Sequence, residues 1–523
     1  FILQDAVLDV STQAGSDLAT LESEIQIRTD GNARITDTGS QITQLIASEL
    51  FEIGYASSEA AGDVLFEGEV EVKSRNVILG AGYGSGSTDS LSQIDLGEAR
   101  FDGLDAESNL VLFSLTQQAD LDTDIITQST LDVSTLETLT LSARGGKLKV
   151  SDPANISSEG LDLNLVGATG IEIAQDFPGA GQLLSSLSID ALAELVVNAE
   201  TAQRISDAAQ NLVITAGSAG DEAVPSLVIE GDLSASDSII LHAGAEGTGD
   251  LVISTSDASN PIILESSQVT LWAGNGDSAG DAEVQLANVR LQSSETEAVS
   301  AFTLRQDAAI SDETIGAESG NVAFTGGIAG VEYTLRADAE ISNQPAILIG
   351  EAGSELLEDS RLHLYARGEI ALEEETNLTV QSLDVGGIND FTYTSALSDH
   401  IIYSDPAQSQ LTLRAGLGGT TGVLSFESGM TVQANEIRLV AGDGVSDTPS
   451  DTEPNIDLTA GSGTAPTFQS ATEAGLTFLF RQGADITEED LPDFETQFGE
   501  GTRPKDIAFR SDNGRIEFSG FAS

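Results

Sequence analysis

Apolar and polar residues alternate in short runs along most of the chain, and many runs end in a small residue followed by glycine. Alternation with period two puts every second side chain on one face of an extended segment. Alanine leaves room at a corner, and glycine adopts the positive φ of a tight turn at little cost. The pattern predicts short strands joined by turns. It recurs as VILGAG (77–82), LVITAG (212–217), IILHAG (239–244), VTLWAG (269–274), LTLRAG (411–416), IRLVAG (437–442) and IDLTAG (456–461).

A second pattern also places a strand, a small residue and another strand in succession. It occurs as FSLTQQADL (113–121), FTLRQDAAI (302–310), YTLRADAEI (333–341) and FLFRQGADI (478–486).

Each unit has only one apolar face, so it cannot fold alone and must stack on its neighbours. Equivalent leucines lie 30 residues apart at Leu241 and Leu271, 26 apart at Leu413 and Leu439, and 19 apart at Leu439 and Leu458. We therefore predict a right-handed parallel β-solenoid, an all-β fold that runs as a single continuous domain over residues 1–523. It should have about twenty irregular coils of roughly 20–30 residues each, with acidic loop insertions.

Two other interpretations of the pattern remain open. Residues 193–212 are compatible with a short helix as well as with a strand. A tandem array of two-sheet sandwiches would also be rich in strands, but it would repeat at about 100 residues, and no such period is visible.

The charge is strongly acidic. The chain has 85 Asp and Glu against 21 Lys and Arg, a formal net charge of −64. This excludes nucleic acid and anionic membranes as partners through repulsion. A surface rich in acid and poor in lysine suits a saline habitat, where salt screens self-repulsion, although a secreted fibre could also stay soluble in this way. No apolar run is long enough for a spanning helix, so we expect no membrane insertion.

Cysteine is absent from the 523 residues. Its absence favours a secreted protein, extracellular or on the cell surface, that is not held together by disulfides. The chain begins and ends in strand-like sequence, and neither end has the polar cap that a solenoid needs. We therefore expect a segment of a longer chain.

The L-x-L-x-A-G repeats and the turns rich in Ser, Thr, Asn and Gly resemble the β-helical shaft of filamentous-haemagglutinin-type bacterial exoproteins. The resemblance covers most of the chain, and it implies a secreted adhesin or surface-filament shaft. The family's secretion module carries an Asn-Pro-Asn-Gly-like motif that is not found here, so the secretion route stays open.

Calcium is the one cofactor for which the sequence offers candidates. Asp277 and Asp281 lie in one acidic Gly-rich loop, and Asp443, Asp447 and Asp451 lie in another. Carboxylate oxygens in such turns are what a hard cation binds. With so many acidic residues the alternative is a solvated turn.

Other side chains with possible chemistry are expected to face outward. His242, His363 and Trp272 occupy outward strand positions, and Trp272 could contact a sugar or a neighbouring chain, or be covered by the loop at 274–283. Lys147 and Lys149 beside Arg144 form an outward basic patch.

We therefore expect a structural or adhesive extracellular fibre without catalysis. Its partners would be copies of itself, the longer parent chain or surface glycans. One alternative is a β-helical carbohydrate-active enzyme or tailspike, which requires Asp, Arg and aromatic residues on one face over consecutive coils. Another is a calcium-dependent surface-layer or matrix protein.

Overall fold

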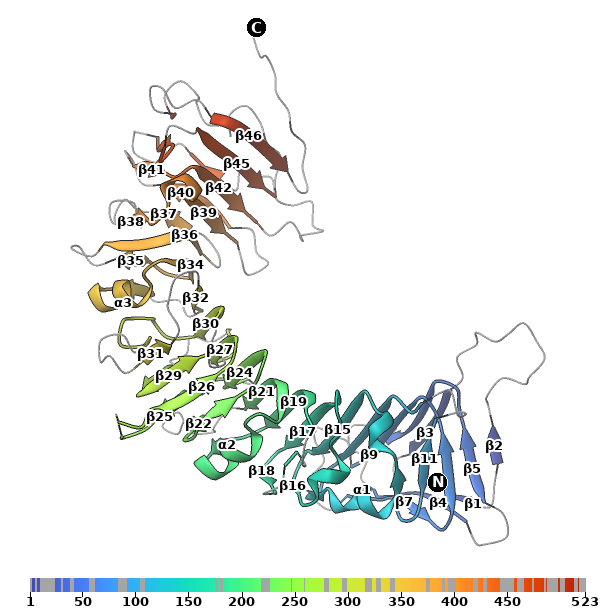
Figure 1. Ribbon diagram of the computed structural model, residues 1–523. Helices are drawn as coiled ribbons and strands as arrows, with labels where there is room; N and C mark the ends of the chain where they lie inside the picture. Colours follow the sequence, from blue (N-terminus) through green and yellow to red (C-terminus); the bar gives the residue numbers. More distant parts are fainter. Residues whose placement is uncertain are drawn as a thin grey trace. The chain divides into compact units, whose positions relative to one another are not determined.

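The chain is all-β, and its strands pair in parallel to form a β-solenoid, as the sequence predicts (Figure 1). The computed structural model describes residues 2–516, except for gaps at 5–6, 10–23, 30–31, 38–41, 56–61, 83–91, 104–108, 175–176, 179–181, 218–225, 246, 258, 277–281, 294–298, 316–321, 326–330, 339–343, 373–376, 388–390, 394–400, 417–421, 427–429, 443–455, 459–464, 473–474, 484–485, 487–496, 499–503 and 512–515.

The chain divides into two compact units. Unit 1 comprises residues 1–249 with 263–265, and unit 2 comprises residues 250–262 with 266–523. Each unit contains one long parallel sheet, to which every successive coil contributes a strand, and several shorter sheets on its other faces.

The long sheet of unit 1 is built from strands of about six residues that pair with their neighbours in the order given. They are β3 (Glu24–Thr29), β6 (Leu50–Tyr55), β9 (Asn76–Ala81), β12 (Leu112–Gln117), β15 (Thr138–Ala143), β17 (Asp162–Gly167), β19 (Leu184–Ala191), β21 (Ala209–Ala216) and β24 (Ser238–Ala243).

Shorter strands form the other faces of unit 1. One sheet contains β1 (Ile2–Gln4), β4 (Ala33–Thr36), β7 (Val64–Glu67) and β10 (Ile94–Asp95); a second contains β2 (Val7–Asp9), β5 (Thr43–Ile46), β8 (Val70–Lys73), β11 (Arg100–Asp102) and β14 (Thr130–Leu131). The remaining strands are β13 (Leu121–Asp122), β16 (Leu148–Val150) and β18 (Ile171–Ile173), β20 (Leu195–Val197) with β22 (Leu227–Ile229), and β23 (Leu233–Ser234) with β26 (Ile262–Glu265). The helices are α1 (Asp124–Gln128), α2 (Ala199–Ile205), η1 (Val133–Thr135) and η2 (Pro153–Asn155).

The long sheet of unit 2 follows the same plan. Its strands are β27 (Gln268–Ala273), β30 (Ala301–Gln306), β32 (Glu332–Ala337), β34 (Ser360–Ala366), β36 (Leu378–Gly387), β39 (Gln410–Ala415), β42 (Glu436–Ala441), β45 (Leu476–Gln482) and β46 (Pro504–Ser511), and β38 (Ile401–Tyr403) pairs with the start of β36.

The other faces of unit 2 again carry short parallel strands. They are β25 (Leu251–Ser254) with β28 (Val284–Ala287), β29 (Val289–Gln292) with β31 (Val322–Thr325), β33 (Ile347–Ile349) with β35 (Ile370–Leu372), β37 (Phe391–Tyr393) with β40 (Leu424–Phe426) and β43 (Ile456–Asp457), and β41 (Thr431–Gln433) with β44 (Thr467–Gln469). The helices are α3 (Glu351–Leu356) and η3 (Pro406–Gln408).

Inward side chains of each long sheet stack in register from coil to coil. No member of the two columns below is more than 3% exposed. Since each buried aliphatic side chain stabilises the fold by about 2 kcal/mol, these columns form the core of each unit. They run through Phe51, Val77, Phe113, Leu139, Leu163, Leu187, Leu212 and Ile239 in unit 1, and through Val269, Phe302, Tyr333, Leu362, Leu383, Leu411, Ile437 and Phe478 in unit 2.

The second sequence pattern has a structural explanation at the corner that follows the strand. Gln117 and Gln306 replace the usual alanine there and are buried. Their amide oxygens accept hydrogen bonds from the backbone N–H groups of Ile94, at 3.0 Å, and Val284, at 2.9 Å. The glutamine thus satisfies backbone groups of the neighbouring coil that would otherwise be buried without a partner.

The number of turns is smaller than the expected count of about twenty. Part of the error came from Leu439 and Leu458, which the sequence placed on successive coils. Leu439 lies in β42, whereas Leu458 follows β43, which belongs to another face and pairs with β40. The partner of Leu439 in the next strand of the long sheet is Phe480, 41 residues later. The 19-residue spacing therefore joined two faces of one coil.

Both interpretations of residues 193–212 were partly right. The segment holds strand β20, helix α2 and the start of β21. The Asn198 side chain accepts a hydrogen bond from the Thr201 N–H at 2.9 Å and so caps the helix. Ala202 and Ile205 bury one face of the helix.

Replacing a residue of the inward column should weaken unit 1 strongly. We expect Leu187→Ala in β19 to lower the free energy of unfolding by about 2–5 kcal/mol, because it leaves a cavity between coils. Ser188→Ala, one position along on the outward side, should cost less than about 0.5 kcal/mol. Urea unfolding monitored by circular dichroism measures both changes. Equal effects of the two substitutions would contradict the assigned faces.

Candidate functional site: an arginine-rich face of unit 2

The outward side chains of the unit 2 long sheet also align in rows, one residue per coil. The row nearest the corner contains Trp272, Arg305, Arg336, Tyr365, Gly386, Arg414, Val440, Arg481 and Arg510. Two parallel rows, which start at Thr270 and Gln268, add Arg361, His363 and Arg438. We name these rows the arginine face.

The charge of this face is opposite to that of the chain as a whole. Its three rows contain seven arginines, Arg305, Arg336, Arg361, Arg414, Arg438, Arg481 and Arg510, and four acidic residues, Glu332, Asp384, Glu436 and Asp506, a formal balance of +3. The balance is +2 when Asp338, which follows β32 and pairs with two of these arginines, is included. The matching rows of unit 1 contain one arginine, Arg28, and four acidic residues, Glu24, Glu52, Asp162 and Asp190, a balance of −3. The concentration of arginine is therefore specific to unit 2.

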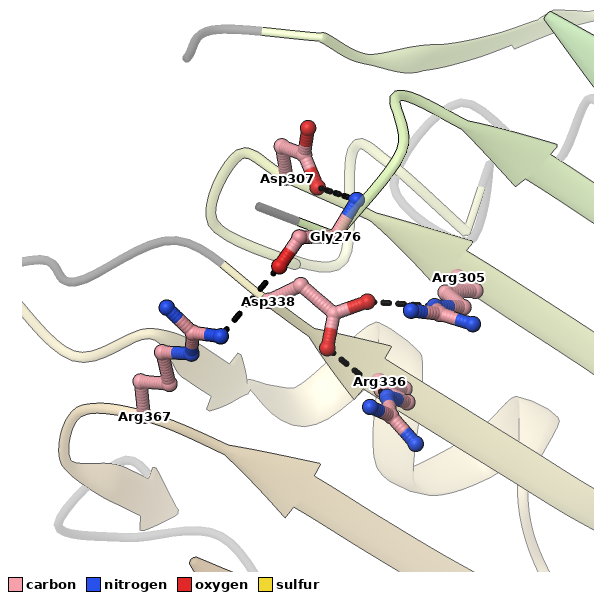
Figure 2. Close-up of polar contacts among 6 residues, drawn as sticks. All are labelled: Gly276, Arg305, Asp307, Arg336, Asp338 and Arg367. Carbon is pink, nitrogen blue, oxygen red and sulfur yellow. Dashed lines mark hydrogen bonds and ion pairs between the residues drawn. The ribbon is translucent and has the colours of Figure 1, made fainter. Parts of the chain in front are cut away.

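A buried carboxylate orients two of these arginines (Figure 2). Asp338, directly after β32, has a side chain only 1% exposed. Its Oδ1 accepts a hydrogen bond from Nε of Arg336 at 2.7 Å, and its Oδ2 accepts one from Nε of Arg305. Because a buried carboxylate is stable only when it is paired, the two guanidinium groups are held in place by the same interaction that stabilises Asp338.

The glycine turn after β27 lies beside Arg305 and is held by two hydrogen bonds. The Gly276 N–H donates to Oδ1 of Asp307 at 3.1 Å, and Arg367 donates from Nη2 to the Gly276 carbonyl at 3.2 Å (Figure 2). Gly276 has a φ of +80°, and a Cβ there would collide with the Arg305 guanidinium. A glycine is therefore required at this position.

A second buried carboxylate organises the centre of the face. Oδ2 of Asp384 accepts hydrogen bonds from the Tyr365 hydroxyl at 2.9 Å and lies 3.0 Å from Nη2 of Arg414. Nδ1 of His363 lies 3.4 Å from the same oxygen, and its Nε2 lies 3.5 Å from Glu332. Burial of Tyr365, followed by the nearby charge of Asp384, raises the pKa of its hydroxyl above the usual value, so the hydroxyl stays a hydrogen-bond donor.

Trp272 lies outward, as the alternation predicts, and contacts an arginine of the next coil. The guanidinium carbon of Arg305 lies 4.0 Å from the centre of the indole ring. This distance is that of a cation–π contact. The loop 274–283 was expected to cover Trp272, and its residues 277–281 lie outside the described residues.

The calcium candidates cannot be placed in this site. Asp277, Asp281, Asp443, Asp447 and Asp451 all lie outside the described residues. Within the part of the chain that the structure describes, no group of three or more His, Asp or Glu side chains is arranged to hold a metal ion. Calcium binding at those loops remains a prediction.

The other outward residues are placed as expected, with one adjustment. Lys147 and Lys149 are exposed, but each forms an ion pair, with Glu172 at 2.9 Å and Asp122 at 2.8 Å. His242 and His363 are half-buried rather than exposed. The basic patch at 147–149 is thus a pair of surface ion pairs, which contribute little to stability.

The arginine face was missed in the sequence although its signal was present. Arginine stands at the same position of the repeat in FTLRQ, YTLRA, LTLRA and FLFRQ, directly before the corner residue. Only the register shows that these positions form one row.

No protein-family model, no curated protein and no solved structure matches the chain. Among the described residues, no helix is long and apolar enough to cross a membrane.

The buried carboxylate should matter far more to stability than exposed ion pairs do. We expect Asp338→Asn to destabilise unit 2 by about 3 kcal/mol, because it leaves Arg305 and Arg336 without their negative partner. Glu67→Gln, which removes the exposed partner of Arg34, should change stability by less than about 1 kcal/mol. Urea unfolding of the two variants measures the difference. A neutral Asp338→Asn would show that the carboxylate does not organise the face.

Proposed function

We propose that the chain is a structural and adhesive element of an extracellular bacterial surface fibre, without catalysis of its own. The observation that carries the proposal is the stack of inward side chains in register. Such a stack makes each coil depend on its neighbours, and it stabilises a repeat array that can be extended coil by coil. An extended shaft can be built in this way.

The composition supports the same proposal. The absence of cysteine and the net charge of −64 suit a secreted protein that remains dispersed in salt. The resemblance of the L-x-L-x-A-G repeats to the shafts of filamentous-haemagglutinin-type exoproteins points the same way. The partners under this proposal are further coils of a longer parent chain, other copies of the chain, and surface glycans.

Surface labelling tests this proposal. An antibody raised against the purified chain should label intact cells of the source bacterium as strongly as permeabilised cells. Deletion of the gene should abolish labelling and reduce attachment of the cells to surfaces. Labelling that requires permeabilisation would place the protein inside the cell and contradict the proposal.

A second candidate is a β-helical carbohydrate-active protein. The arrangement that this alternative requires, with Asp, Arg and aromatic residues on one face over consecutive coils, is present in the arginine face. However, the two central carboxylates, Asp338 and Asp384, are at most 8% exposed and are paired with arginines. A general acid or base must reach its substrate, so this face favours binding over hydrolysis. Release of new reducing ends from a polysaccharide would establish the second candidate instead.

A further inference from the structure

We propose that the arginine face binds a linear polysaccharide that carries carboxylate groups, such as a polyuronate. The inference rests on the proposed adhesive function and gives that function a ligand class and a location. It follows from three properties of the face: its repeat, the orientation of its arginines, and the aromatic rings among them.

The repeat of the face suits a linear, periodically charged polymer. Adjacent coils are separated by about 4.8 Å, so each row offers one side chain per coil along a straight path. The corner row carries arginine at five of its nine positions, Arg305, Arg336, Arg414, Arg481 and Arg510. A chain of uronic acids laid along this row would find a cationic side chain at most coils.

The arginines are oriented before any ligand arrives. Asp338 fixes Arg305 and Arg336, and Asp384 fixes Arg414. A guanidinium has five N–H donors, so these contacts leave further donors on each of the three side chains. The three side chains keep 23%, 28% and 38% of their surface exposed. Preorganised, partly exposed guanidinium groups bind carboxylates in a bidentate manner at low entropic cost.

Carboxylates are already the groups that this face accommodates. Arg438 pairs with Glu436 through two of its nitrogens, and Asp338 is shared by two arginines. The carboxylate groups of a bound polymer could pair with arginines of the face in the same way.

Aromatic rings lie among the arginines and add apolar contact area. His363 and Tyr365 have ring centroids 6.3 Å apart, and Trp272 lies three coils away in the corner row. All three are half-buried, so each also presents some surface outward. Flat rings pack against the C–H faces of sugar rings.

The net charge of −64 repels a strand of nucleic acid and a polyuronate alike, so the test below measures both. A second copy of the chain is a different anionic occupant. The acidic side of a second copy could meet the arginine face, but its carboxylates do not follow one row: in the unit 1 sheet they lie on β3, β6, β17 and β19, in three different rows. A regular polymer matches the row better.

Binding of polygalacturonate to the full chain tests the proposal, measured by biolayer interferometry at about 0.15 M salt. We expect the double variant Arg361→Glu/Arg438→Glu to bind about tenfold more weakly or worse. Both arginines lie on the face, and neither pairs with a buried carboxylate. The matched control is Arg28→Glu/Arg75→Glu in unit 1, which makes the same charge change at exposed arginines with carboxylate partners, and it should bind like the parent. Thermal melting should show both variants folded.

Three results would overturn the inference. Equal weakening in both variants would indicate a general charge effect, and binding of dextran sulfate or single-stranded DNA as tight as that of polygalacturonate would indicate a general polyanion site. Absence of polysaccharide binding, with self-association that the face variant abolishes, would assign the face to a second copy. In each case, surface labelling of intact cells would still support the shaft, so the two proposals fail separately.

Discussion

The parallel hydrogen-bonded register between successive coils is the constraint on which every other feature of the two units depends. Side chains alternate along a strand, so a shift of one residue would exchange the buried and exposed sets. Leu187 stays buried because it pairs with Leu163 and Leu212, and the same register places Arg305 between Trp272 and Arg336. The same register therefore determines both the buried core and the candidate site.

The register also concentrates charge. In a chain with four acidic residues for each basic one, arginines that recur once per coil become neighbours only because the coils stack. Arginines in adjacent coils would repel each other without compensation. Asp338 is shared between Arg305 and Arg336, and Asp384 lies beside Arg414. These buried carboxylates offset the repulsion between the arginines and also fix the orientation of their side chains. The face keeps a positive balance while its most buried members are paired.

The sequence predicted what local physics determines. The alternation and the Ala-Gly corners in VTLWAG and LTLRAG were sufficient for the strands, the turns and the stacked fold. The coil count was wrong because a strand of another face, β43 in IDLTAG, has the same local pattern as a strand of the long sheet. No feature of the sequence distinguishes Asp338 from the many solvated carboxylates. Its burial is compensated by Arg305, 33 residues earlier, which only the register of the strands brings beside it.

The register can be measured directly, because the chain has no cysteine of its own. Thr303 in β30 and Thr334 in β32 are paired outward residues of adjacent coils. In Thr303→Cys/Thr334→Cys the two Cα atoms should lie at about 5 Å, within the range of a disulfide. We predict rapid, complete cross-linking under mild oxidation, and little in the out-of-register pair Thr303→Cys/Glu332→Cys, because Glu332 in β32 is the partner of Ala301. Efficient cross-linking of the second pair, or none of the first, would contradict the stacked-coil account and the arginine face with it.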